Sequence, residues 1–167
     1  MIDYAAYGSN MNRGQMLLRA GGETEAVATG TALLRDWQIE FRRGVLTVVP
    51  QPGAMVPLAL WCISELARKA LDRYEGAPWL YAPRMLPGSS LTPLSGSMPD
   101  ACLIYEMTVD GANTIDRADA PGATYYETCV QGYADFGLND WLWALEAARE
   151  RSLQTHPPIA ERLKVLV

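Results

Sequence analysis

Residues 4–11 read YAAYGSNM, an apolar stretch that runs directly into a Gly-Ser-Asn turn. The tyrosines and the isoleucine just before them favour a β-strand that ends at this turn. Ser9 or Asn10 can then cap a helix over the residues that follow. Backbone N–H groups at such a helix start favour an anion, and Gly8 would let a ligand approach the backbone closely. The stretch is therefore compatible with two interpretations, a plain turn with a helix cap or a loop that holds a ligand.

The rest of the chain alternates short apolar β-patterns with two clear helical patterns. The clearest helix covers residues 64–76, SELARKALDRYEG, with Ser64 as N-cap and Gly76 as the residue after its end. A second helix is expected over residues 138–152, LNDWLWALEAARERS. We expect strands, with a turn near Gly30, in the segments EAVATGTALLRDWQIEFRRG, VLTVVPQPG, MVPLALWCI, YAPRMLPG and ACLIYEMTV. Strands outnumber helices and few βαβ units occur, so the pattern predicts an α+β fold, a small mixed or antiparallel β-barrel with flanking helices.

Composition limits the kinds of partner. The chain has 167 residues, which suits one domain over 1–167 with residues 152–167 as a peripheral tail. The formal net charge is −5 and no Lys/Arg block stands out, so we expect neither nucleic acid nor a membrane as a partner. The three cysteines are odd in number and far apart, which fits neither a disulfide framework nor a CxxC metal site. Their pattern indicates a reducing, cytoplasmic location.

The only histidine of the sequence, His156, lies in the stretch THPP, which is typical of a turn or linker. One histidine excludes a His-based metal cluster, and a histidine-based catalytic triad would depend on this residue alone. We therefore expect no metal and no cofactor. Any chemistry would come from carboxylates, hydroxyls and backbone amides.

Glu75 stands out because it falls in the last turn of the helix expected over residues 64–76. The free carbonyl groups there carry a partial negative charge, which destabilises a carboxylate by roughly 0.3–1 kcal/mol. Burial beside Tyr74 and Trp79 would raise its pKa further, as suits a general acid or base near neutral pH. The ordinary alternative is a solvated glutamate that precedes the glycine ending the helix.

The adjacent pair Tyr125 and Tyr126 lies in the segment ATYYETC. If this segment is a strand, one phenol faces inward and the other outward, and either could donate to a ligand. An aromatic core pair is the alternative interpretation. The long segment that leads into it, residues 110–123, is unusual for a compact domain and is a candidate functional loop.

Taken in order, YAAYGSNM, TGTALLRDWQIEFRRG, PLALWCI, LDRYEG and GATYYETCVQGYADFGL resemble the gamma-glutamylcyclotransferase-like family over residues 2–150. The resemblance implies a small mixed barrel whose Tyr-Gly-Ser-Asn loop holds a γ-glutamyl group and whose later glutamate transfers a proton. Position by position, it implies Glu75 as the catalytic residue and a set of substrate-binding residues: Tyr7, Gly8, Ser9, Asn10, Met11, Tyr81 and Tyr125. Tyr125 keeps the family spacing best, although Tyr126 stays open.

Two departures from the family pattern concern the pocket. Met11 stands where leucine is usual, and GAPWLY, residues 76–81, brings Pro78 and Trp79 to the lip. The leaving group therefore stays open, including an amine other than an amino acid. The pocket lip, formed by Trp79 and residues 111–122, would decide it.

The resemblance implies a reaction that needs no nucleophilic side chain. The α-amine of a γ-glutamyl amide attacks its own side-chain carbonyl and closes a 5-oxoproline ring, while Glu75 moves the proton. Backbone N–H groups of residues 8–11 would bind the substrate carboxylate or the oxyanion. The expected partner is a small γ-glutamyl substrate. The alternative from another class is a non-catalytic small-molecule-binding barrel, and the presence of Glu75 argues against it.

Overall fold

The computed structural model describes residues 1–114 and 119–155. Its six strands form one sheet in the order β4-β6-β1-β3-β2-β5. All neighbouring strands are antiparallel except β1 and β6, which run parallel with Tyr4 opposite Leu103. The strands are β1 (Ile2–Ala6), β2 (Ala26–Arg42), β3 (Val45–Ile63), β4 (Tyr81–Pro87), β5 (Leu91–Gly96) and β6 (Ala101–Met107).

One mixed sheet with helices beside it confirms the predicted α+β class. The sheet is open, so the predicted closure into a barrel is wrong. Within the described residues β4 pairs only with β6, and β5 pairs only with β2. Both edge strands contain proline, at Pro83 in β4 and at Pro93 in β5. Proline has no N–H to donate to a further strand, which is how natural sheets end at an edge.

Strands β2 and β3 form one long hairpin around a two-residue turn. Arg43 and Gly44 both have positive φ, 54° and 83°, as a tight hairpin turn requires. The turn predicted near Gly30 is instead a bulge inside β2, where the register with β3 shifts between Ala28 and Gly30. A Cβ atom at Gly30 would lie 2.2 Å from the carbonyl oxygen of Ser95, so glycine lets β5 approach there.

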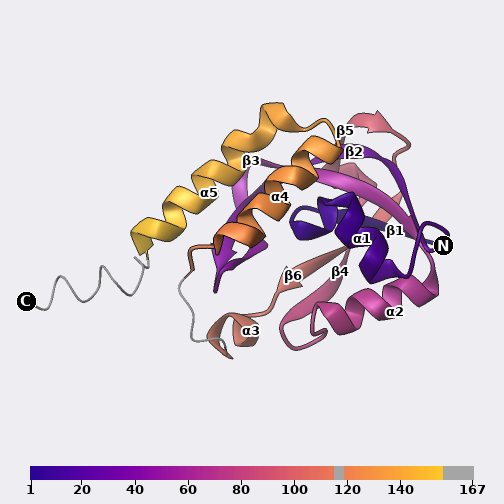
Figure 1. The fold of residues 1–167 in the computed structure, drawn as a ribbon. Helices are drawn as coiled ribbons and strands as arrows, with labels where there is room; N and C mark the ends of the chain where they lie inside the picture. The colour runs from indigo at the N-terminus through magenta and orange to yellow at the C-terminus, as the bar shows by residue number, and fades with distance from the viewer. Residues whose placement is uncertain (115–118, 156–167) are drawn as a thin grey trace, which may run out of the picture.

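The helices pack on the sheet and position residues 8–11, which we call the N-terminal turn (Figure 1). In that view α1 and α4 lie in front of the strands, α2 runs below α1, and α5 lies beyond α4. None of the helices within residues 1–114 and 119–155 is long and apolar enough to cross a membrane. The helices are α1 (Arg13–Ala20), α2 (Glu65–Tyr74), α3 (Val109–Thr114), α4 (Ala123–Asp135) and α5 (Leu142–Thr155), with single 3-10 turns η1 (Ser9–Met11), η2 (Gly88–Ser90) and η3 (Asn139–Trp141).

Helix α2 follows its predicted boundaries. The Ser64 hydroxyl accepts a hydrogen bond from the backbone N–H of Ala67 at 3.0 Å, and Gly76 follows the helix with φ of 63°. Glu75 is the C-cap residue between them. The expected tail is only partly described, because residues 152–155 belong to α5 and His156 with the remaining residues lies outside the described range.

The cap predicted for the first helix is wrong, and the strand considered for Tyr125 and Tyr126 is a helix. The cap of α1 is Asn12, whose side chain accepts from the backbone N–H of Gln15, and not Ser9 or Asn10. Ser9 and Asn10 lie one 3-10 turn earlier, which leaves both side chains available for other contacts. Tyr125 and Tyr126 lie in α4 and not in a strand, because residues 123–135 bury an apolar helical face that includes Cys129 and Tyr133.

Gly132 lets α4 pack directly on the N-terminal turn. A Cβ atom at this position would lie 2.7 Å from the Met11 Cβ and 2.8 Å from the Asn12 backbone nitrogen. Met11 itself is fully buried under α4. The position of the turn therefore depends on close contact with a helix more than 100 residues later in the sequence.

We expect Gly132→Ala to destabilise the fold by about 1–3 kcal/mol, the usual cost of overpacking a tight contact. Urea denaturation measures this change. Gly14→Ala is the matched control, because that glycine lies inside α1 with its closest neighbour at 3.5 Å, and there alanine should be neutral or stabilising. Equal effects of the two substitutions would contradict the proposed packing role.

Candidate functional site

A pocket at the end of β1 gathers residues from seven elements or turns. Gly8 and Glu75, predicted to face one pocket, both line it. Its complete lining is Tyr4, Tyr7, Gly8, Ser9, Asn10, Leu46, Glu75, Tyr81, Tyr105 and Tyr125. Of the eight catalytic and substrate-binding residues that the resemblance implied, only Met11 is missing, since its side chain is buried beneath α4.

The Glu75 carboxylate is held by the N-terminal turn. The amide nitrogen of Asn10 donates to Glu75 Oε1 at 2.8 Å and to the Tyr4 hydroxyl at 2.7 Å. Burial raises the pKa of Glu75, and the Asn10 hydrogen bond and the nearby Arg19 charge oppose this rise without cancelling it. The arrangement therefore gives a carboxyl group that exchanges its proton closer to neutrality than an ordinary glutamate.

The burial of Glu75 has a different source from the predicted one. Tyr74 and Trp79 were expected to cover it, but their exposed fractions are 53% and 81%. The aromatic rings around the carboxylate come instead from the pocket lining, in which five tyrosines take part. Trp79 is absent from that lining.

Leu46, at the start of β3, is held between two of these tyrosines. The Tyr81 hydroxyl donates to the Leu46 carbonyl at 2.6 Å, and the Tyr125 hydroxyl accepts from the Leu46 N–H at 3.2 Å. Burial raises the pKa of Tyr7, Tyr81 and Tyr125 well above the usual range, so all three phenols keep their protons. They can act as hydrogen-bond donors or acceptors but not as bases at neutral pH.

Tyr125 and Tyr126 have separate environments. A Cβ atom on Gly8 would lie 3.3 Å from the Tyr125 hydroxyl, so Tyr125 reaches the turn and glycine keeps that side of the pocket open. Tyr126 lies outside the lining, next to Phe41 and with the Arg149 guanidinium carbon 4.9 Å from its ring centroid. The structure thus places the first tyrosine of the pair, and not the second, at the pocket.

The turn offers fewer backbone donors than the sequence suggested. The Met11 N–H donates to the Gly8 carbonyl at 2.9 Å, and the Asn12 N–H donates to the Ser9 carbonyl at 3.1 Å. These bonds close the 3-10 turn and remove Met11 from the expected set of anion donors. Within the described residues, the N–H groups of this turn that make no such bond are those of Gly8, Ser9 and Asn10, and these can bind a ligand.

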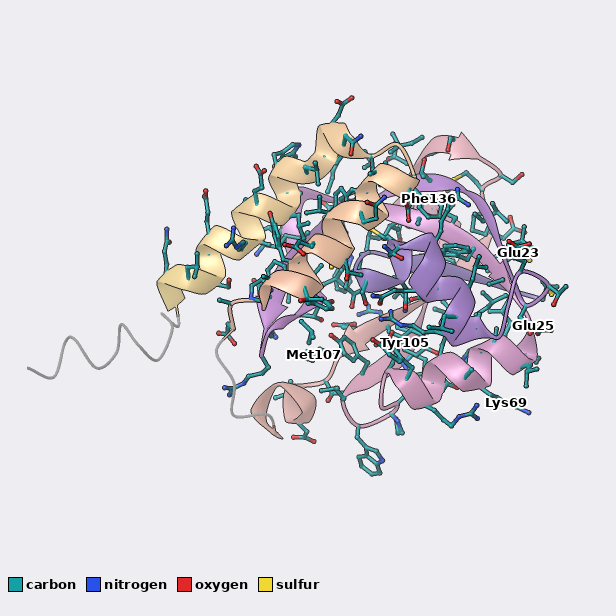
Figure 2. All side chains as sticks on the ribbon, in the orientation of Figure 1. Glu23, Glu25, Lys69, Tyr105, Met107 and Phe136 are labelled. Carbon is teal, nitrogen blue, oxygen red and sulfur yellow. The ribbon has the colours of Figure 1, made fainter. Side chains whose placement is uncertain are left out.

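Four residues of the site were missed from the sequence: Tyr4, Leu46, Tyr105 and Arg19. Tyr4 and Tyr105 looked like ordinary strand residues, but they lie on the adjacent strands β1 and β6 and their rings meet edge to face at 5.8 Å. The Tyr105 hydroxyl donates to Asp72 on α2 at 2.6 Å. Figure 2 shows Tyr105 in the interior beside α2, with Lys69 on the outer side of that helix. No local pattern marks such residues, because strand pairing and helix packing bring them together.

Two of the three cysteines are unsuited to act as nucleophiles. Cys102 and Cys129 are buried, and burial raises their pKa to about 11 and about 12. Both therefore remain thiols at neutral pH. Among residues 1–114 and 119–155, no three His, Cys, Asp or Glu side chains gather as metal ligands would.

Comparison with known families decides the identity of the fold. The model of the family described as gamma-glutamyl cyclotransferase, AIG2-like, matches residues 4–127. The chain belongs to this family. Membership supports gamma-glutamyl cyclotransferase-like activity in general. No curated protein matches the chain in sequence.

Solved structures show the same fold as this cyclotransferase-family chain. The crystal structure of the human protein loc79017 is 23% identical with a TM-score of 0.71, over 87% of this chain and 86% of that one. A structure named gamma-glutamyl cyclotransferase is 22% identical with a TM-score of 0.71 and the same coverage of both chains. YkqA from Bacillus subtilis is 20% identical with a TM-score of 0.69, over 93% of this chain and 55% of that one.

The raised pKa of Glu75 predicts a pH-dependent gain in stability for Glu75→Gln. A carboxyl whose folded-state pKa lies above its unfolded value stabilises the fold at acidic pH, and this contribution is lost as the pH rises through the folded-state pKa. Glutamine mimics the neutral form. Urea unfolding should therefore show the variant more stable than the parent at about pH 8, with the difference vanishing near about pH 4.

Glu127→Gln serves as the control for this measurement, because Glu127 is exposed on α4 and should give no comparable gain. A Glu75→Gln protein that is less stable than the parent only at the higher pH would show that Asn10 and Arg19 outweigh burial.

Proposed function

We propose that the chain is a cyclotransferase that cleaves a γ-glutamyl amide and releases 5-oxoproline together with an amine or an amino acid. The observation that carries the proposal is the hydrogen bond from Asn10 to Glu75, which puts a carboxylate of raised pKa beside the donors of the N-terminal turn. The substrate is a small molecule, and the proposed reaction uses no metal or cofactor.

The reaction is an intramolecular exchange of one amide for another. The α-amine nitrogen of the substrate attacks the side-chain carbonyl carbon and forms a five-membered ring. The tetrahedral intermediate then expels the amine on the other side of that carbon, so one C–N bond forms and one breaks. Holding the substrate in the folded conformer supplies at most roughly 7–11 kcal/mol of the barrier.

Glu75 fits the proton transfers of this exchange. Its carboxylate accepts a proton from the attacking amine and returns it to the departing amine, which leaves the enzyme unchanged. Burial makes the carboxylate a stronger base than an exposed glutamate. The Asn10 hydrogen bond holds Oε1, so the second carboxylate oxygen, Oε2, is the one we assign to the proton transfer.

The turn and the tyrosines fit the negative charges of the substrate. The N–H groups of Gly8, Ser9 and Asn10 can receive the substrate carboxylate or the oxyanion of the tetrahedral intermediate. Tyr125, which keeps its proton, accepts from the Leu46 N–H and can use that proton to orient the substrate. The lining contains no lysine or arginine, so recognition of the carboxylate falls to neutral donors within the described pocket.

The leaving group remains a choice between an amino acid and another amine. Trp79 and residues 111–122 were expected to form the lip that decides it. Trp79 is 81% exposed and outside the pocket lining, and residues 115–118 lie outside the described range. A panel of γ-glutamyl amides assayed for 5-oxoproline distinguishes these substrates, and release from none of them would favour a non-catalytic binding protein.

We expect Glu75→Gln to lower kcat by about 10²–10⁴-fold, the usual contribution of a positioned acid or base. The parent rate should rise with pH through an ionisation above about 4.3, the ordinary value for glutamate, because the base works only when deprotonated. Release of 5-oxoproline measures both effects, with Glu127→Gln as the exposed control. Turnover by Glu75→Gln at the parent rate would rule out the assignment.

The two neighbouring tyrosines give a matched pair of variants. Tyr125→Phe removes the hydroxyl at the pocket, so we expect a loss of about tenfold or more in kcat/KM, equal to the net worth of one or two hydrogen bonds. Tyr126→Phe removes a hydroxyl outside the pocket and should leave kcat/KM close to the parent value. The opposite ranking of the two variants would assign the wrong tyrosine to the site.

A further inference from the structure

Arg19, on α1, binds the two polar side chains of the N-terminal turn from outside the pocket. One guanidinium nitrogen, Nη1, donates to Ser9 Oγ at 2.9 Å and to Asn10 Oδ1 at 2.5 Å. The other, Nη2, donates to Gln15 Oε1. Arg19 is not part of the pocket lining, so any effect on a ligand passes through the residues that it holds.

The aromatic ring next to Glu75 covers the guanidinium of Arg19. The guanidinium carbon lies 3.9 Å from the centroid of the Tyr74 ring, within cation–π range. Tyr74 directly precedes Glu75 at the end of α2. One cation therefore connects α1, the N-terminal turn and the end of α2.

The hydrogen bond from Arg19 fixes the orientation of the Asn10 side-chain amide. Arginine can only donate, so it requires the amide oxygen of Asn10 on its side. The amide nitrogen then faces the opposite side, where both of its N–H groups are used by Tyr4 and Glu75. A reversed amide would place its oxygen against an oxygen of the ionised carboxylate, and neither atom could donate to the other.

We propose that Arg19 is a positioning residue of the site: it holds the Asn10 amide so that its nitrogen faces Glu75 and fixes one oxygen of the carboxylate. Its effect on turnover rests on the proposed function, while its effect on the orientation and ionisation of Glu75 does not. The Ser9 contact works in the same direction, because a lone pair of Oγ taken by Arg19 leaves the hydroxyl proton for the pocket.

Arg19 also supplies the positive charge that acts on Glu75. The phenols that face Glu75 keep their protons because burial raises their pKa, so they contribute no charge at neutral pH; they are Tyr4, Tyr7, Tyr81 and Tyr125. Asp72 lies in α2 before Glu75, and it is paired with Arg68 and with the Tyr105 hydroxyl. Loss of Arg19 should therefore raise the pKa of Glu75 for two reasons: a positive charge is removed, and the Asn10 amide becomes free to turn.

The first experiment measures Glu75 itself, without turnover. Carboxyl ¹³C NMR titrations of the full chain, with the Glu75 signal assigned from Glu75→Gln, compare the parent with Arg19→Met. We expect the Glu75 ionisation to move to higher pH in Arg19→Met. Arg73→Met is the matched control, because it removes an arginine that is exposed on the last turn of α2, two residues before Glu75.

The second experiment separates the charge of Arg19 from its hydrogen-bonding fork. Arg19→Lys keeps the charge but loses the planar fork that spans three acceptors. We expect Arg19→Lys to restore most of the Glu75 ionisation. Its plateau kcat for 5-oxoproline release should stay lower by about tenfold or more, as displaced catalytic groups usually cost. Complete rescue by lysine would reduce the role of Arg19 to its charge and overturn the positioning role.

A double-mutant cycle with Asn10→Ala tests whether Arg19 acts through the amide. If it does, Arg19→Met lowers kcat much less in the Asn10→Ala background than in the parent. If the two substitutions lower kcat independently, so that their effects multiply, the proposal is overturned. It is also overturned if Arg19→Met has the same Glu75 titration and the same kcat as Arg73→Met. If Arg19→Met fails to fold, Arg19→Lys and the Asn10→Ala background still give the comparison.

Absence of 5-oxoproline release by the parent would count against the proposed function only. The NMR titration would still decide whether Arg19 sets the ionisation of Glu75. A shift seen by NMR without any parental turnover would support a positioned carboxylate in a binding site.

Discussion

The hydrogen bond between the Asn10 amide and the Glu75 carboxylate joins two segments that are 65 residues apart in sequence. A bond to a charged acceptor is stronger than one between neutral groups, and it gains further in a partly buried setting. Each partner is placed by a separate part of the fold. Glu75 depends on where α2 ends, and Asn10 depends on the 3-10 turn that follows β1. The site exists only where both conditions are met.

The position of β1 in the middle of the sheet meets the second condition. Because β1 lies between β3 and β6, the turn after it emerges among residues from both neighbours. Tyr7 donates to the Tyr105 carbonyl at 2.6 Å, and Leu46 from β3 lies under Gly8. Helix α4 packs against the turn, since Gly132 allows it to rest on Met11. The turn is therefore held in place by its surroundings as well as by its own few internal bonds.

Local rules predicted the parts of this structure that local physics determines. The Ser64 cap and Gly76 bound α2 and so placed Glu75 at its end, as the sequence indicated. Arg19, Tyr4 and Tyr105 could not be found this way, because a basic residue on a short helix and tyrosines in strands are ordinary locally. The same limit applies to α4, because two adjacent tyrosines do not show whether they lie in a strand, and the burial of a helical face decides. It also explains the open sheet, since closure depends on whether distant edge strands meet.

The opposing influences on Glu75 explain why the site needs both a dry pocket and a polar contact. Attack requires the neutral amine, and an α-amino group gives up its proton at a much higher pH than an ordinary glutamate does. A carboxylate with an unperturbed pKa is a weak base toward such an amine, so burial improves the match between the two. Burial alone favours the protonated carboxyl, which cannot accept a proton. The Asn10 hydrogen bond and the Arg19 charge favour the ionised form. Burial among the rings can therefore raise the pKa of Glu75 while the carboxylate stays available as a base.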